Sequence, residues 1–572
     1  MYSGMCRKIF AVMFLLVMSA CANGAAFIPE QPIMPVRELQ PGMTGYILTV
    51  LRGTETERIP VKVVSISPQK PGRELSDEIL IRITGRQKLA QGMSGSPVYV
   101  DEKLIGGVRS GWELSDQTLA FVAPIESMCA VFDDEGSQKS QGVMLSEVSI
   151  SGLSTTNSAL QALGKSLGMN FVQGVPLSVS SLTLSGEKLK PGDAVTAMIV
   201  WGDVEAGAVG TVTATARDGR FLAFAHAFNK SGESAYPAAK TYIHEIVNSL
   251  AFPFKLASPQ SINGTFIQDR EAGVGGKMGT YPPSISAKLI FKDLDTGRED
   301  SSKFRVVTDE FLSGPILVRV FAALAEEFWR RKGQGTMSVS LRVDGKALPN
   351  GWVRKDIFYS DSNILGEAFK QTQAIIAAYM IQPFEETMPA GFTMTIEATQ
   401  KPKVLLIEDV TLLTSADTVK PGGEIGVSVK LRGWRTEPTT HNFTMKIPDD
   451  ASDGVCELIV RGGGTESMGQ KAIEGGWKSI DSLQRMFTEF RAADANNELI
   501  LELNTDRLNQ ELKKALARKK GKQSKREPDL LPEEEEYLSE TKARRIEEGT
   551  LRIFSSDYFI DGMMKRIIHV EK

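Results

Sequence analysis

The chain of 572 residues is poor in cysteine and histidine, with four of each. No Cys-x-x-Cys pair and no pair of histidines at metal-binding spacing occurs, which argues against a structural zinc site. Cys6 and Cys21 lie close to the N-terminus, whereas Cys129 and Cys456 are far apart in the sequence. We expect these last two to be buried free thiols rather than a disulfide.

The chain also lacks an excess of charge of either sign. It has 66 basic and 70 acidic residues, for a formal net charge of -4. This balance gives no electrostatic reason to expect a nucleic-acid partner. No Gly-rich phosphate loop after a strand and no cluster of metal ligands stands in residues 286–572, so no cofactor or metal is expected.

Long apolar runs are absent except at the N-terminus, which reads 7-RKIFAVMFLLVMSACA-22. A basic start, a short apolar run and small residues are typical of a signal peptide, here residues 1–26. We expect export to the periplasm or cell envelope. Two cleavages stay open: Met18–Cys21 resembles a lipoprotein box, which would leave a lipidated Cys21 at a membrane surface, and 20-ACANGAA-26 suits ordinary signal peptidase.

The exported part is expected to be mainly β, because short alternating apolar runs are separated by turn residues. Six such runs within residues 27–135 predict a small barrel. A Ser/Gln/Gly-rich passage leads to a second strand-rich domain, residues 136–285. The six runs are 46-YILTVL-51, 61-VKVVSI-66, 79-ILIRIT-84, 97-PVYV-100, 104-LIGGV-108 and 119-LAFVAPI-125.

The C-terminal half is expected to be non-catalytic and to place the first half in the envelope. Residues 286–402 predict an α/β segment, since 313–331 and 362–381 have apolar positions at helical spacing. Alternation returns in 403–506, which predicts a β-sandwich module. Residues 507–572 are expected to be a charged connector and a last strand, with 507–548 the most mobile part of the chain. The oligomeric state is not predicted.

The loop 92-GMSGSP-97 carries the chemistry. Acyl transfer needs a nucleophile beside a base, together with backbone N–H groups directed at the developing oxyanion. We predict that Ser94 is the nucleophile and that the amides of Gly92 and Ser94 are the oxyanion donors. Ser96 is expected to support the loop through a local backbone hydrogen bond. The nucleophile elbow Gly-x-Ser-x-Gly is excluded, because its fifth position is Ser96.

Histidine is the expected general base, and the choices are few. His226 ends a strand just before a polar turn and is the best candidate. His244 stands in a helix-like stretch, His441 in the predicted sandwich, and His569 three residues from the end. We predict that Ser94 and His226 lie within hydrogen-bond reach, or one rotamer from it.

These two segments resemble the SpoIVB serine peptidase family. The resemblance rests on 92-GMSGSP-97 and on 208-AVGTVTATARDGRFLAFAHAF-228, and it covers roughly residues 34–260. It implies a chymotrypsin-like double β-barrel and hydrolysis of peptide bonds outside the cytoplasm, hence a protein or peptide substrate. By position it implies that Ser94 is the nucleophile and His226 the general base.

The sequence departs from the family pattern in three ways. The serine loop precedes the histidine segment, which is a permuted order; Ala225 replaces the glycine before the histidine; and Gly85 stands where the orienting acid is expected. Three acids are open substitutes: Asp77, Asp116 and Asp203. Two functions follow, an exported serine endopeptidase and a catalytically inactive protease-fold protein that binds or scaffolds in the envelope.

Overall fold

The computed structural model describes residues 26–67, 78–133, 147–176, 182–229, 232–249, 252–413, 418–449, 451, 453–464, 480–504 and 537–571. The predicted signal peptide, apart from its last residue, lies outside these residues, as does most of the predicted charged connector. The chain forms two compact units. The first runs to Ser284 and includes Lys303–Ser313, and the second comprises Ile285–Ser302 and Gly314–Lys572.

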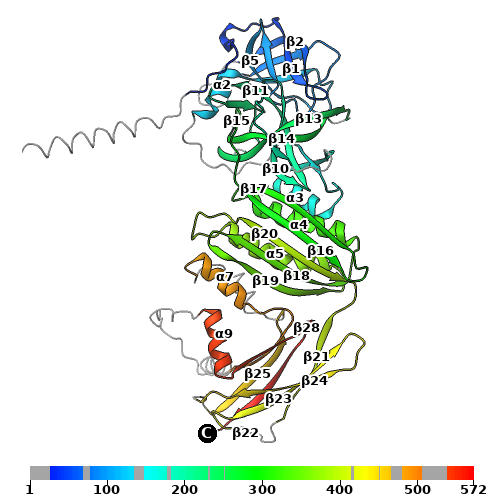
Figure 1. The fold of residues 1–572 in the computed structure, drawn as a ribbon, viewed down its shortest axis with the longest axis vertical. Helices are drawn as coiled ribbons and strands as arrows, with labels where there is room; N and C mark the ends of the chain where they lie inside the picture. The colour runs from blue at the N-terminus through cyan, green and yellow to red at the C-terminus, as the bar shows by residue number, and fades with distance from the viewer. Residues whose placement is uncertain are drawn as a thin grey trace, which may run out of the picture. The chain divides into compact units, whose positions relative to one another are not determined.

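The first unit begins with a closed barrel of six strands, in the order β1-β2-β3-β6-β5-β4 (Figure 1). In β2 alternate apolar residues point inward: Ile59, Val61 and Val63 are buried and their neighbours are exposed. The small barrel predicted from the six apolar runs is confirmed. Its strands are β1 (Thr44–Val50), β2 (Thr56–Ile66), β3 (Ile79–Ile83), β4 (Pro97–Val100), β5 (Lys103–Ser110) and β6 (Leu119–Pro124).

Six later strands pair into a second ring. Successive antiparallel pairings join β10 to β13, β14, β15, β12 and β11, and β11 pairs back to β10. We call the two rings the Ser-bearing barrel and the His-bearing barrel. The second consists of β10 (Ala194–Gly202), β11 (Glu205–Thr215), β12 (Arg220–Ala223), β13 (Gly232–Val247), β14 (Phe254–Arg270) and β15 (Gly273–Met278).

The two barrels share a buried apolar cluster. Leu104 and Met128 from the first contact Ala214 and Leu222 from the second, and Phe27 of the N-terminal segment joins them. This packing fixes one barrel against the other, so loops at their junction can form one site. The short elements of the unit are η1 (Val36–Glu38), α2 (Ile125–Cys129), η2 (Ala130–Phe132), β7 (Glu147–Ser151), α3 (Ser158–Leu167), β8 (Asn170–Gln173), β9 (Thr183–Leu184) and the end of β17 (Glu299–Val307), which pairs with β10.

The second unit combines an α/β layer with a sandwich (Figure 1). The helices predicted at 313–331 and 362–381 are present as α4 (Ser313–Trp329) and α5 (Ile364–Met380). In the sheet, β20 pairs with β16 in parallel and with β18 antiparallel, and β18 pairs with β19. The bounds of these strands are β16 (Ser284–Asp293), β18 (Gly335–Gly345), β19 (Leu348–Ser360) and β20 (Gly391–Thr399).

The predicted β-sandwich is also present. Sheets β24-β23-β21-β28 and β22-β29-β25-β26-β27 share one core, in which Val427 and Leu431 pack with Leu458 and Leu501. Three strands beyond residue 506 belong to it. The elements are β21 (Val404–Leu412), β22 (Thr418–Val419), β23 (Glu424–Gly433), β24 (Thr439–Lys446), β25 (Gly454–Gly462), α7 (Leu483–Ala492), β26 (Glu498–Asn504), α9 (Leu538–Glu547), β27 (Leu551–Ser555), β28 (Phe559–Asp561) and β29 (Met563–Val570).

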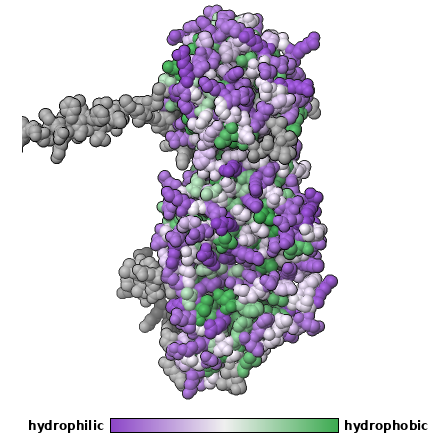
Figure 2. All heavy atoms as spheres, in the orientation of Figure 1, coloured by the Kyte–Doolittle hydropathy of each residue, from purple (hydrophilic) through white to green (hydrophobic). Residues whose placement is uncertain are grey.

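The described residues contain no helix long and apolar enough to cross a membrane. The face drawn in Figure 2 is mostly hydrophilic, with only small hydrophobic areas. One local prediction is wrong: His244 lies in strand β13, not on a helix, and its Nε2 is 2.7 Å from Ser258 Oγ on the paired strand β14. Cys129 and Cys456 are free thiols, but only Cys456 is buried as expected, whereas Cys129 is half-buried.

Candidate active site

The loop that carries Ser94 runs from the end of β3 to the start of β4 and needs its glycines. Gly92 and Gly95 have φ angles of +86° and +87°, which side chains with a Cβ rarely adopt. A Cβ on Gly95 would also lie 2.2 Å from the carbonyl oxygen of Thr211 and 2.3 Å from the amide nitrogen of Phe224. The close approach of the His-bearing barrel therefore requires glycine after the serine.

Two threonines of β11 hold this loop from the other barrel. The Thr211 amide donates to the Ser94 carbonyl at 2.8 Å, and the Thr211 hydroxyl donates to the Gly92 carbonyl at 2.9 Å. The Thr213 hydroxyl donates to the Gly95 carbonyl at 2.6 Å. The Gly-Thr-Val-Thr segment thus binds three carbonyls of the serine loop.

The backbone amides of the serine loop fall into two sets, those that have a hydrogen-bond acceptor and those that have none among the described residues. Those of Met93, Gly95 and Ser96 donate to backbone carbonyls at 3.0, 2.7 and 2.9 Å. Those of Gly92 and Ser94 have no acceptor among the described residues, and both residues line a cavity. Two unpaired amides flanking a serine hydroxyl are the arrangement that an oxyanion hole requires.

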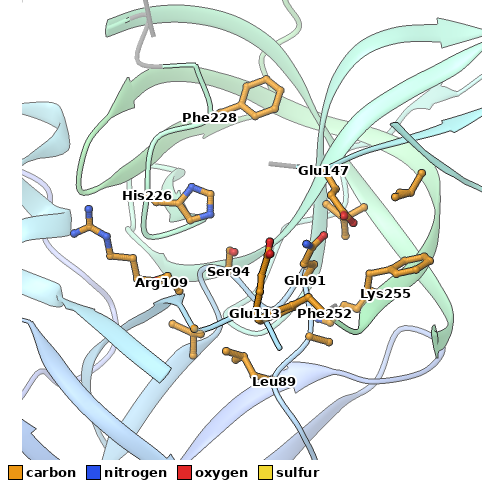
Figure 3. Close-up of a pocket in the computed structure, with 18 of the residues that line it drawn as sticks. Leu89, Gln91, Ser94, Arg109, Glu113, Glu147, His226, Phe228, Phe252 and Lys255 are labelled. Carbon is orange, nitrogen blue, oxygen red and sulfur yellow. The ribbon is translucent and has the colours of Figure 1, made fainter. Parts of the chain in front are cut away.

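His226 faces the same cavity as Ser94 (Figure 3). It follows β12 through Phe224 and Ala225, whose φ angles of +68° and +55° are left-handed. This backbone explains why a glycine is expected before the histidine: Ala225 occupies a conformation that favours glycine. No hydrogen bond joins Ser94 to His226 among the described residues. Catalytic contacts are often long when no substrate is bound. Because Ser94 and His226 line one cavity, they remain the candidate nucleophile and base.

The tautomer of His226 follows from one contact. Its Nδ1 lies 2.7 Å from the carbonyl oxygen of Ala227. Because a carbonyl can only accept, Nδ1 carries the hydrogen and Nε2 is left with its lone pair. Burial lowers the pKa of His226 below its ordinary 6.5, a backbone hydrogen bond to Ala227 opposes this, and nearby Arg109 lowers the pKa further. The imidazole therefore stays neutral, and able to accept a proton, to lower pH than an exposed histidine does.

None of the described candidate acids contacts His226. Asp116 is exposed and accepts hydrogen bonds from Thr118, and Asp203 accepts from the amide of Lys303. Asp77 lies outside the described residues. The charge of Glu271 raises the pKa of His226, and this carboxylate is paired with Arg109 at 3.0 Å. The sequence did not single out this Arg–Glu pair, because its members are 162 residues apart.

Ser96 supports the loop, but not by the local backbone bond that was predicted. Its side chain is fully buried, and its Oγ lies 2.9 Å from Thr49 Oγ1 and 3.2 Å from Thr211 Oγ1. Ser96 therefore ties the loop to β1 and β11 at once. Since it is shielded from the cavity, it cannot act as the nucleophile on a bound substrate.

The cavity has a volume of about 410 Å³, which suits a ligand the size of a few amino-acid residues. One wall is apolar, formed by Leu89, Val172, Val209, Phe252 and Phe254. Glu147 projects into it, and burial raises the pKa of this carboxyl (Figure 3). Among the described residues no group of three or more metal-ligating side chains could hold an ion.

No family model, no curated protein and no solved structure matches this chain.

Proposed function

We propose that the protein is an exported serine endopeptidase of SpoIVB type, built on a permuted chymotrypsin-like double barrel. The observation that carries the proposal concerns Gly92 and Ser94, whose amides have no acceptor among the described residues, and which line one cavity together with His226. A glycine-rich turn that served packing alone would have no reason to leave two amides unpaired beside a serine.

The proposed reaction assigns one role to each group. Ser94 Oγ attacks the carbonyl carbon of the scissile peptide bond while Nε2 of His226 takes its proton. The amides of Gly92 and Ser94 stabilise the oxyanion that forms. The same imidazole then gives the proton to the leaving amine, and water repeats the sequence on the acyl-enzyme to release the second product.

The Ala227 carbonyl takes the place of the third triad member. It fixes the tautomer of His226, as a carboxylate would, but it brings no full negative charge to stabilise the imidazolium. Turnover should accordingly be slower than in a triad with an acid. The missing acid is also the basis of the alternative function. An inactive protease-fold binding or scaffold protein of the envelope would have the same cavity but would not carry out the reaction.

Labelling with a fluorophosphonate probe separates the two functions. The probe phosphonylates a serine, with loss of fluoride, only when base and oxyanion donors act on that serine. We expect the wild-type chain to be labelled, Ser94→Ala to be unlabelled, and Ser149→Ala, which alters another serine of the same cavity, to be labelled as wild type. A folded wild-type chain that stays unlabelled while binding peptides would establish the binding protein instead.

We also propose that the chain acts in the periplasm or cell envelope, on the strength of residues 7–22. Mass spectrometry of the mature N-terminus from expressing cells tests this. A lipidated Cys21 gives a membrane-attached enzyme, and cleavage within 20-ACANGAA-26 gives a soluble one. An intact Met1 on the protein from such cells would contradict export.

A further inference from the structure

A buried lysine is among the residues that line the cavity of Ser94 (Figure 3). Lys255, the second residue of β14, is only 3% exposed, although it is charged in water at neutral pH. It has no ion pair with any described carboxylate, and its Nζ donates to Thr49 Oγ1 on β1 at 2.8 Å. Burying an ammonium without a counter-charge is costly, so a lysine kept here calls for a reason other than stability.

Lys255 is the first member of a chain of hydrogen bonds that ends on the serine loop. Thr49 Oγ1 is 2.9 Å from Ser96 Oγ, which is 3.2 Å from Thr211 Oγ1, and the Thr211 hydroxyl donates to the Gly92 carbonyl at 2.9 Å. Thr49 Oγ1 accepts from Lys255, Ser96 Oγ is the donor toward both Thr49 and Thr211, and the Thr211 hydroxyl donates to the Gly92 carbonyl, so the four side chains form one connected set of hydrogen bonds.

Water cannot replace the three hydroxyls of this chain. Thr49, Ser96 and Thr211 are each 0% exposed, so every hydroxyl depends on its neighbours for a partner. The stem of Lys255 adds a steric contact, because its side-chain carbons would lie 3.1–3.3 Å from a Cβ on Gly92. The lysine therefore acts on the Gly92 backbone both through this hydroxyl chain and by packing.

We propose that Lys255 is a positioning residue of the oxyanion hole, which acts through Thr49, Ser96 and Thr211 on the Gly92 carbonyl. Holding that carbonyl in place keeps the amides of Gly92 and Ser94 turned toward the cavity. The inference rests on the proposed function for its catalytic consequence. Lys255 is not assigned a role as base, since its Nζ donates to Thr49 Oγ1 at 2.8 Å.

The test compares variants that break the chain of hydrogen bonds with variants that keep it. Lys255→Met keeps the length of the stem and removes the nitrogen, and Thr49→Val removes one hydroxyl with little change of shape. Thr49→Ser restores the hydroxyl and should rescue. Lys240→Met is the matched control, because Lys240 belongs to the same barrel but pairs with Glu187, away from the loop.

Two readouts are needed. The maximal rate of fluorophosphonate labelling should fall at least about tenfold in Lys255→Met and Thr49→Val, with the probe concentration at half-maximal rate unchanged, because oxyanion donors act on the transition state. Hydrogen exchange of peptides that cover residues 90–97 should become faster in the same variants. Thr49→Ser and Lys240→Met should behave as wild type in both.

The outcomes separate the inference from the proposed function. Labelling and exchange unchanged in folded Lys255→Met would overturn the inference while leaving the peptidase intact. A wild-type chain that is never labelled would defeat the peptidase, and the exchange data would still decide whether Lys255 positions the loop. Where Lys255→Met fails to fold, as judged by circular dichroism, the comparison of Thr49→Val with Thr49→Ser decides alone.

Discussion

The burial of Lys255 makes the stability of the first unit depend on pH in a calculable way. Burial lowers the pKa of Lys255 from 10.5 to about 7. Between these values the unfolded chain holds a proton on this lysine that the folded chain has released. Stability must therefore rise with pH through this window, and the full cost of burying the charge applies below about pH 7.

The magnitude follows from the same two values. A difference between 10.5 and about 7 corresponds to about 5 kcal/mol of unfavourable free energy at low pH. Between pH 7 and pH 9 about 2 kcal/mol of it should be recovered. Lys255→Met has no such proton to release. Between pH 7 and pH 9 the unfolding free energy of the wild type should therefore rise by about 2 kcal/mol relative to that of the variant.

The measurement must report the first unit alone, because two units need not unfold together. Urea unfolding with a pulse of thiol alkylation does this. Burial raises the pKa of the Cys129 thiol to about 12, so this thiol should react slowly until the first unit unfolds. Peptide mass spectrometry then distinguishes Cys129 from Cys456 of the second unit.

Other titrating groups should cancel from this comparison. The cavity also contains His226, Glu113, Glu147 and the Arg109–Glu271 pair, and all are present in wild type and Lys255→Met alike. The same experiment on Lys240→Met gives the background effect of losing a lysine from this barrel. A difference between wild type and Lys255→Met that stays constant from pH 7 to pH 9 would refute the reasoning, because it would mean that Lys255 does not release its proton on folding.

Three further predictions concern the serine loop and its neighbours. The rate of fluorophosphonate labelling should fall on the acid side with a midpoint below pH 6.5, because burial lowers the pKa of His226; a midpoint at or above 6.5 in a pH–rate profile would contradict this. Thr213→Val should lower the unfolding free energy of the first unit by about 1–3 kcal/mol in urea titrations, because the Gly95 carbonyl loses its donor at 2.6 Å. An unchanged unfolding free energy would mean that water reaches that carbonyl. Gly95→Ala should cost more than about 3 kcal/mol in the same titrations or prevent folding, since its Cβ would meet Thr211, whereas Gly186→Ala, with nothing within 4 Å, should be nearly neutral.

The local sequence pattern was sufficient to predict those strands and turns that are determined by neighbouring residues. The alternation of Ile59, Val61 and Val63 predicts a strand because one face is buried, and the glycines of 92-GMSGSP-97 predict a turn because their backbone angles demand them. The same reasoning failed at 241-TYIHEIV-247. That segment is short and has apolar residues at spacings that fit both a helix and a strand, and its pairing with β14 decided the outcome.

The parts of the site that could not be predicted depend on contacts between distant segments. Lys255 and Thr49 are 206 residues apart, and nothing near either one indicates that they meet. Ser96 was expected to bond locally because serine often does so in turns, but the two barrels bring two threonine hydroxyls within its reach. The contact between the Ala227 carbonyl and His226 was not predicted either, because a search for an orienting acid considers only side chains.

The order of the two barrels along the chain matters little for a site of this kind. The serine loop is held by hydrogen bonds from Thr211 and Thr213 of β11, and His226 comes from the turn that follows β12 in the same barrel. These contacts run across the junction of the barrels, and none uses the connection between them. Exchanging which barrel comes first would lengthen or shorten that connection but leave every one of the contacts in place. A permuted chain can therefore bring together the serine loop, the histidine and the two unpaired amides that the proposed reaction requires, because their geometry is set by the docking of the barrels rather than by sequence order.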